Sequence, residues 1–145
     1  MKEINARTII EIMGSPEDHV NNTMNLVIKK LEERPGIKIL KKELFKAKKI
    51  KDQPLWSTFV EFEITVKTID TLIGFCFDFL PSSVEILNEE DIGFKNDDVT
   101  DFVNDLLGRL HQYDMALKNI YAQNMILKEE MEKLKGNKEI KKAKK

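Results

Sequence analysis

The segment from residue 99 to residue 135 constrains this chain most, because its apolar residues repeat with a strict heptad spacing. Steps of four and three residues alternate through Val99, Val103, Leu106, Leu110, Tyr113, Leu117, Ile120, Asn124, Leu127, Met131 and Leu134. A straight helix drifts by about 20° per heptad from such a repeat, so five heptads would carry the stripe about 100° around the helix and off any flat surface. The spacing therefore predicts a supercoiled helical partner rather than packing along the chain's own sheet.

Within this repeat, Asn124 is the residue that favours a particular assembly. With Leu106 at heptad position d, Asn124 lies at position a, where two facing asparagines hydrogen-bond across a parallel dimer axis and disfavour other oligomers. The flanking charges agree with a parallel dimer, in which a residue at position g of one helix faces the residue at the next position e of the other helix. Arg109 would then pair with Asp114 of the second helix, and residue 130 with residue 135. We expect a parallel homodimer, with an antiparallel pair or a larger bundle as the alternative.

Upstream of residue 88 the chain alternates between strand-like and helix-like patterns. A turn signal separates each element from the next, and Pro81 stops the last helix. The first expected elements are a central strand at 7–13 and a helix that ends at 34–36, with Ser15 as its N-cap and Pro16 at its first position. An edge strand at 37–49 and a strand at 56–67 follow. The last two elements are a helix capped by Thr68 or Asp70 and a strand at 83–87.

This order, which covers residues 7–87, resembles the ferredoxin-like fold and, within it, the ACT-type domains. The resemblance implies an α+β, βαββαβ sandwich in which an antiparallel sheet carries both helices on one face. It also implies a small-molecule site, because ACT domains often carry a glycine in the loop after the first strand, and Gly14 lies in the matching place. Glu17 and Asp18 at the start of the following helix disfavour an anionic ligand there.

The full chain of 145 residues is therefore expected to hold one small core and an extension. We predict a head domain at residues 1–87, a connector at 88–96, a dimerising coiled-coil helix at 97–135 and a disordered basic tail at 136–145. At about 1.5 Å per residue the helix would run about 55 Å, far beyond a head whose radius of gyration is about 12 Å.

The basic tail follows Gly136, where the helix is expected to end. The net charge of −1 combines about +5 in residues 135–145 with about −6 in the rest of the chain. Lysine-rich ends bind phosphate backbones without sequence specificity, so the candidate nucleic-acid-binding residues are Lys138, Lys141, Lys142, Lys144 and Lys145. A frayed, solubilising terminus is the alternative.

A second apolar strip lies outside the heptad seam. It consists of Met115 and Ala122 at position f, Met125 at b and Ile126 at c, where a simple two-stranded coil carries polar residues. We interpret this strip as a docking face for a larger partner. Packing against the chain's own head or against a neighbouring dimer would explain it equally well.

The side chains that usually carry catalysis or bind metals are sparse. His19 and His111 have no companion at ligand spacing, and Cys76 lies within an apolar helix pattern, where cysteine is more often a buried hydrophobe than a nucleophile. We expect no cofactor, no metal and no enzymatic activity. The single cysteine, and the lack of an apolar run near the ~20 residues of a membrane span, predict a cytoplasmic protein.

Together these patterns favour a non-enzymatic homodimeric adaptor, with paired heads on a parallel coiled coil that bind a macromolecular partner. An RNA- or ribosome-associated factor that uses the lysine tails to bridge two copies of its target is the second hypothesis. A small-molecule-responsive regulator that uses the Gly14 loop is the third, and it rests on the ACT resemblance alone.

Overall fold

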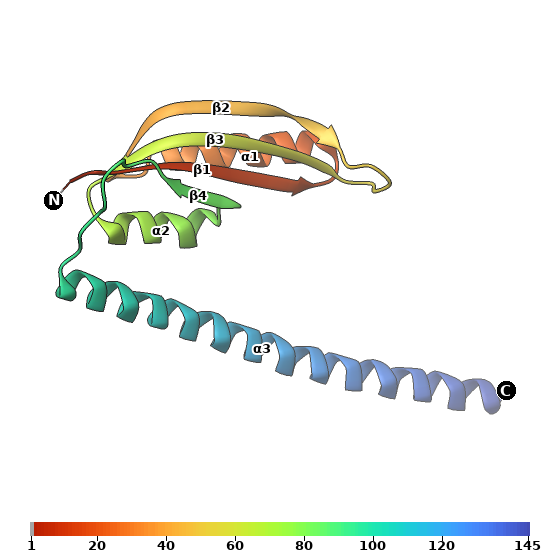
Figure 1. Cartoon of the computed structure of the whole chain (residues 1–145). Coiled ribbons are helices and arrows are strands. Elements are labelled where there is room, and N and C mark those ends of the chain that lie inside the picture. Colours follow the sequence, from red (N-terminus) through yellow and green to blue (C-terminus); the bar gives the residue numbers. More distant parts are fainter. Residues whose placement is uncertain (1) are drawn as a thin grey trace. The chain divides into compact units, whose positions relative to one another are not determined.

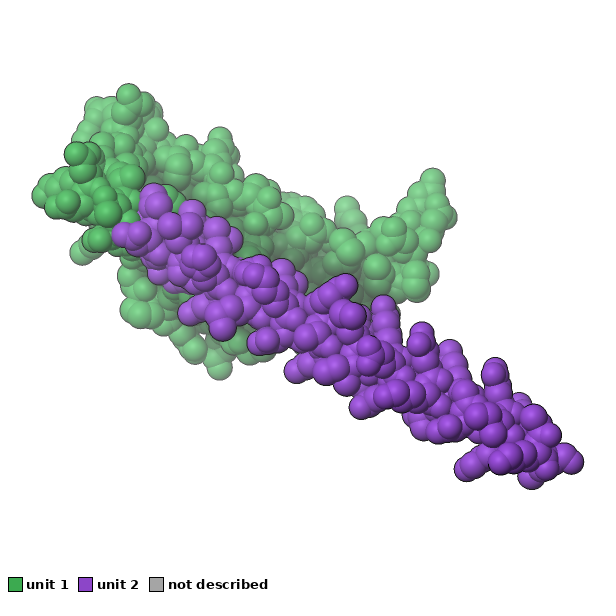
Figure 2. Space-filling view, turned by 90° about the horizontal axis from the view of Figure 1, so that it is seen from below, with its two compact units in different colours: residues 1–102 green, residues 103–145 purple. Residues whose placement is uncertain are grey.

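The structure is a computed structural model that describes residues 2–145. It contains, in order, β1 (Ile4–Gly14), α1 (Glu17–Glu32), β2 (Ile37–Lys49), β3 (Trp56–Val66), α2 (Ile69–Phe79), β4 (Ser83–Ile86) and α3 (Asn96–Ala143) (Figure 1). The chain divides into two compact units, one ending at Phe102 and the other beginning at Val103 (Figure 2). The first unit is the head.

The head is a mixed α+β unit built on a four-stranded antiparallel sheet in the order β2-β3-β1-β4. Strand β1 pairs with β3 over its whole length, from Ile4 opposite Val66 to Gly14 opposite Trp56. Because neighbouring residues of a strand point to opposite faces, the alternation in β3 makes one face of the sheet apolar. The element order is compatible with the ferredoxin-like arrangement.

One core of buried side chains joins this apolar face to both helices of the head. Helix α1 contributes a stripe at three- and four-residue steps, and α2 adds two large side chains. The buried residues of this cluster are Ile4, Ala6, Ile10, Met24, Ile28, Leu31, Val60, Phe62, Ile64, Val66, Leu72 and Phe75. The predicted packing of both helices on one face of the sheet is therefore observed.

The ends of α1 and α2 show which capping predictions were right. Helix α1 begins at Glu17, so the prediction of Ser15 as N-cap was wrong: Pro16 takes that position in extended conformation, with no side-chain capping bond. In α2 the Oγ1 atom of Thr68 accepts a hydrogen bond from the backbone N–H of Thr71, which satisfies one free donor of the first turn and selects Thr68 over Asp70 as the cap.

Strand boundaries differ little from the predicted ones, except in β1. This strand begins at Ile4 rather than residue 7, because Ile4 and Ala6 are fully buried and pair with Val66 and Ile64 of β3. Strand β2 has the predicted bounds and lies at a sheet edge, as expected from its lysines. Strand β4 is short and ends at Ile86, one residue before its predicted end.

Helix α3 is 48 residues long and contains no buried residue. The predicted helix end at Gly136 and the predicted disordered tail were wrong, because the helix continues through Gly136 and Asn137 to Ala143. A single glycine costs a helix interior only about 1 kcal/mol relative to alanine. Since no proline follows, the cooperativity of the long preceding helix is enough to carry it through this position.

Candidate functional site

The seam of α3, defined as the heptad residues from Val99 to Leu134, is exposed along its length. Leu117 and Ile120 near its middle expose 66% and 63% of their surface, and Leu106 is half-buried. In the 3.6-residue geometry of an α-helix, the alternating four- and three-residue steps place these side chains in one stripe that winds slowly around the helix. The helix therefore carries a long exposed stripe that is apolar except at Asn124.

Charged side chains beside the seam pair within the helix in a single chain. Asp105 accepts a hydrogen bond from Arg109 at 3.0 Å, and Asp114 accepts one from Lys118 at 2.6 Å, each across one helical turn. The expected pair of Arg109 with Asp114 requires a second helix and stays a prediction. Asn124 lies exposed in the middle of the same seam, so its amide is available to a facing partner.

The strip outside the seam is also exposed, at Met115, Ala122, Met125 and Ile126. The structure adds Tyr121, which exposes 68% of its surface and lies one helical turn before Met125. Sequence reasoning missed it because the heptad assignment places Tyr121 at position e, beside the seam rather than in the strip.

The terminal lysines lie partly on the end of α3. Lys138, Lys141 and Lys142 are exposed residues at i, i+3 and i+4 of the helix, which places them on one face. Lys144 and Lys145 follow the helix end at Ala143. The end of the helix therefore presents a basic face, whereas a disordered tail was predicted.

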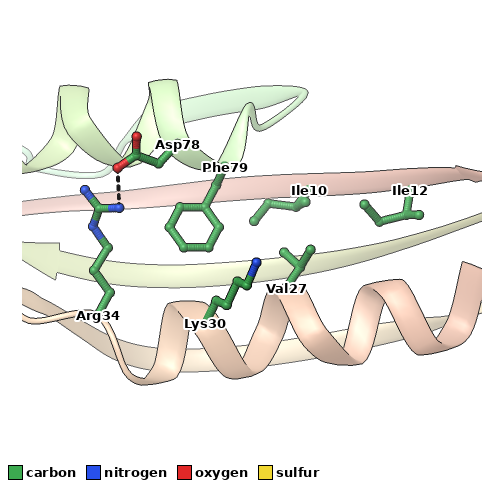
Figure 3. A pocket seen from close by; sticks show the side chains of 7 residues that line it. All are labelled: Ile10, Ile12, Val27, Lys30, Arg34, Asp78 and Phe79. Carbon is green, nitrogen blue, oxygen red and sulfur yellow. Dashed lines mark hydrogen bonds and ion pairs between the residues drawn. The ribbon is translucent and has the colours of Figure 1, made fainter.

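A groove in the head lies between α1 and α2 and has a volume of about 480 Å³ (Figure 3). Ile10 and Ile12 of β1 form its floor, with Val27 and Lys30 on α1 and Phe79 on α2. At one end a salt bridge of 2.5 Å joins the Arg34 guanidinium to the Asp78 carboxylate. The Arg34 guanidinium also lies over the Phe79 ring, 5.6 Å from its centroid.

The polar side chains that line this groove are those of Lys30, Arg34 and Asp78. Its lining has one carboxylate, that of Asp78, and this carboxylate is already paired with Arg34. It contains neither a serine, cysteine or histidine that could act as a nucleophile or base nor a second carboxylate.

The opposite face of the sheet carries a charged row around Arg7, and within residues 2–102 no helix packs on this face. The Arg7 guanidinium lies 3.3 Å from the Glu63 carboxylate, 3.2 Å from that of Glu85 and 3.8 Å from that of Glu61. Lys41 lies 3.0 Å from Glu63. The row joins all four strands. Arg7 of β1 lies opposite Glu63 of β3 on one side and opposite Glu85 of β4 on the other, and Lys41 of β2 lies opposite Glu63.

This row shifts the acid–base properties of its members. The hydrogen bond from Lys41, and then that from Arg7, holds the pKa of the Glu63 carboxyl below its ordinary value, although desolvation opposes this. The hydrogen bond to Glu63 raises the pKa of Arg7, so this guanidinium stays charged. Both shifts favour the charged forms of Glu63 and Arg7, which form the centre of the row.

A family model covers almost the entire chain and therefore decides its family. The model of the MJ0538 family matches residues 5–141. This chain belongs to the MJ0538 family. The match spans every strand of the head and nearly all of α3, so it includes both the head and the long helix of this chain. Searches of curated proteins and of solved structures returned no match.

The reactive side chains of this MJ0538-family chain are dispersed. His19 and His111 are exposed and lie on different helices, and residues 2–145 contain no group of three or more His, Cys, Asp or Glu side chains that could hold a metal ion. Cys76 is half-buried, and this burial raises the pKa of its thiol, so it is neutral and weakly nucleophilic near pH 7.

Gly14, the last residue of β1, lies close to the first turn of α1. A Cβ atom added at Gly14 would lie 3.6 Å from the Val20 side chain and 3.9 Å from that of His19, which is ordinary contact distance. Glu17 and Asp18 supply negative charge in the first turn of α1. The end of β1 at Gly14 is thus close to His19 and Val20 of α1.

None of the helices formed by residues 2–145 combines the length and the apolar character that a membrane span requires.

Proposed function

We propose that this chain is a non-enzymatic, cytoplasmic homodimeric adaptor whose heads are held on a parallel coiled coil formed by α3. The observation that carries the proposal is the exposed heptad seam of α3, a helix of 48 residues without a buried side chain. An isolated helix gains nothing from such a stripe. A second copy of the same stripe buries it in a self-complementary way.

We also assign the head to the ferredoxin-like arrangement. The sheet order β2-β3-β1-β4, with a helix after β1 and another after β3, supports this assignment. Because that fold carries many unrelated functions, the head is proposed here as a binding platform and its partner is argued from its surface.

The energetics of the seam favour association. Burying a leucine-sized side chain contributes about 1.5–3 kcal/mol. The seam residues of two chains over five heptads would each contribute a fraction of this free energy. Their sum exceeds the roughly 8 kcal/mol that corresponds to micromolar affinity. Asn124 lowers the total association free energy, and its proposed role is to fix the register and orientation of the two helices.

Sedimentation equilibrium tests the assembly, because one chain has a mass of 16.9 kDa and the dimer has twice that mass. Orientation is tested by cysteine crosslinking in a Cys76→Ala background. Leu134→Cys should form an interchain disulfide under mild oxidation, because two parallel helices bring both copies of position d together. A dimer in which Leu134→Cys fails to crosslink, while it crosslinks with a Leu106→Cys partner, would be antiparallel.

Asn124→Leu tests the specificity role separately. Leucine at this position should tighten association but admit other oligomers or orientations, so the mass distribution should broaden. If the variant keeps a single dimer mass and the same crosslinking pattern, Asn124 does not specify the assembly.

A second candidate is an RNA- or ribosome-associated factor that binds through the end of α3. The observation in its favour is the basic helical face at Lys138, Lys141 and Lys142. Deleting residues 136–145 tests it: salt-sensitive RNA or ribosome binding should disappear, and binding that persists unchanged would remove the tail from the mechanism.

A further inference from the structure

One end of the edge strand β2 combines two aromatic rings with lysines that make no salt bridge within residues 2–145. We call this surface the basic patch: Phe45, Lys46, Lys48 and Lys49 of β2, with Phe59 of β3. These residues, together with Glu11, Ile50 and Ser57, surround a hollow of about 290 Å³. All of them belong to the head, so the patch is complete within one chain.

The two phenyl rings form a stacked pair on the face opposite the helices. Phe45 lies directly opposite Phe59 in the β2–β3 register, and their ring centroids are 4.4 Å apart with planes inclined by 21°. On either side of Phe59 in the strand, Thr58 and Val60 are buried in the head, whereas Phe59 exposes 38% of its surface. Phe45 is half-buried and Phe59 is exposed, so part of each ring remains open to a ligand beside their cross-strand contact.

The lysines of the patch are not neutralised by the protein. Within residues 2–145, Lys46, Lys48 and Lys49 make no salt bridge, whereas Lys41 and Lys42 earlier in β2 pair with Glu63 and Glu32. Edge strands use lysines to prevent pairing with other chains, and this accounts for lysine on β2 as such. It does not account for stacked rings in the middle of the unneutralised lysines.

The one carboxylate that lines the hollow, that of Glu11, has a defined place. Glu11 accepts a hydrogen bond of 2.5 Å from the Ser57 hydroxyl, and Glu11 lies opposite Phe59 on β1. A carboxylate has further acceptor capacity beyond one hydrogen bond. A hydroxyl donor bound near the rings would therefore find an oriented acceptor.

We propose that the basic patch binds single-stranded RNA. Lysines attract the phosphate backbone, exposed aromatic rings stack on unpaired bases, and the Glu11 carboxylate accepts a hydrogen bond from a ribose 2′-hydroxyl, the group that separates RNA from DNA. The inference names a partner for the proposed adaptor. It stands independently of the coiled coil, because each head carries the whole patch.

The test uses the full-length chain and a fluorescein-labelled oligouridine of about twelve nucleotides, titrated by fluorescence anisotropy at several salt concentrations. Phe59→Leu should weaken binding by about 5- to 150-fold, because one base loses its stacking platform. The triple variant K46Q/K48Q/K49Q should reduce the salt dependence of log K by about 2, since each contact to a single strand contributes about 0.7.

Two matched controls locate the site. The triple variant K141Q/K142Q/K144Q removes the same charge from the end of α3 and should leave the effect of Phe59→Leu unchanged. Oligodeoxythymidine of the same length should bind the wild-type chain more weakly than RNA, and Glu11→Gln should reduce that preference. Fluorescence of Trp56, the single tryptophan, checks that each variant is folded, and Phe45→Leu replaces Phe59→Leu if the latter does not fold.

The inference is overturned if the wild-type chain binds no oligouridine at low salt. It is also overturned if Phe59→Leu and the patch lysine variant bind like the wild type while the tail variant does not, which would place the RNA on α3. Failure of dimerisation leaves these outcomes unchanged, so the anisotropy titration and the sedimentation experiment test the two proposals separately.

Discussion

The substitution Leu117→Lys tests the coiled coil most directly, because Leu117 lies at position a in the middle of the seam. In a single chain Leu117 is 66% exposed, so lysine there should cost the isolated head and helix almost nothing. In a dimer the same position faces its own copy across the helix axis, where two ammonium groups would be desolvated and would repel each other.

The magnitude follows from that exposed surface. Full burial of a leucine side chain contributes about 1.5–3 kcal/mol, and two thirds of this, about 1–2 kcal/mol, is available at each Leu117. Since the dimer contains two such residues, the loss is about 2–4 kcal/mol, which raises the dissociation constant by about 30- to 1000-fold. The desolvation and repulsion of the two lysines add to this, so we expect a monomer at micromolar concentration.

Met115→Lys is the matched control. Met115 is 64% exposed, almost the same fraction as Leu117, and lies two residues away on the same helix, but at position f outside the seam. Sedimentation equilibrium should therefore give a dimer for Met115→Lys and a monomer for Leu117→Lys. If both variants were dimers, or both were monomers, the assignment of the seam as the dimer contact would be wrong.

Three further predictions concern single side chains. Because the pKa of Glu63 is lowered from its ordinary value of 4.5, its ion pairs stabilise the folded head above that pH, and this stabilisation disappears as the pH falls through the lowered pKa. Urea unfolding followed by Trp56 fluorescence should therefore show a weaker loss of stability below about pH 4.5 for Glu63→Gln than for the wild type, and parallel curves would contradict the role of the row. Gly136→Ala should stabilise the end of α3 by about 1 kcal/mol, because an added Cβ has no atom within 4 Å, and far-ultraviolet circular dichroism on heating should show later melting; no change would mean that this segment is not helical in solution. The thiol of Cys76 should react slowly with iodoacetamide in the native protein near neutral pH and faster as the pH rises, whereas the unfolded chain should react fast at once.

Strong periodicity made most of the fold predictable. The alternation from Trp56 to Val66 gave β3 within one residue, and the proline, glycine and threonine signals placed the ends of α2 and β2. The start of β1 was missed because the polar Asn5 hides the alternation, and the pairing of Ile4 with Val66 becomes visible only in the sheet. The end of α3 was missed because glycine was interpreted as a stop signal although no tertiary contact requires a stop there.

The surfaces of the head depend on long-range register, which local sequence does not determine. Phe59 could be assigned to the outer face of its strand from alternation alone. That Phe45 stacks on it depends on the pairing of β2 with β3, and this register shifts between Ile39 and Lys41 and again between Phe45 and Lys48. The groove between α1 and α2 likewise combines residues from three elements. Only the seam of α3 is a one-dimensional feature, and this is why it could be predicted from spacing.

The two proposals together predict a dependence on RNA length. A dimer carries two basic patches, and an RNA long enough to reach both converts the second contact into an intramolecular one, which can raise the affinity by about 10²- to 10⁴-fold. Leu117→Lys should therefore weaken binding of a long oligouridine strongly but leave a short one that fills a single patch nearly unaffected. Phe59→Leu should weaken both, because it acts within each head. If Leu117→Lys changed the affinity for both lengths by the same factor, the coil would contribute to the binding surface itself, and the two-patch model would be wrong.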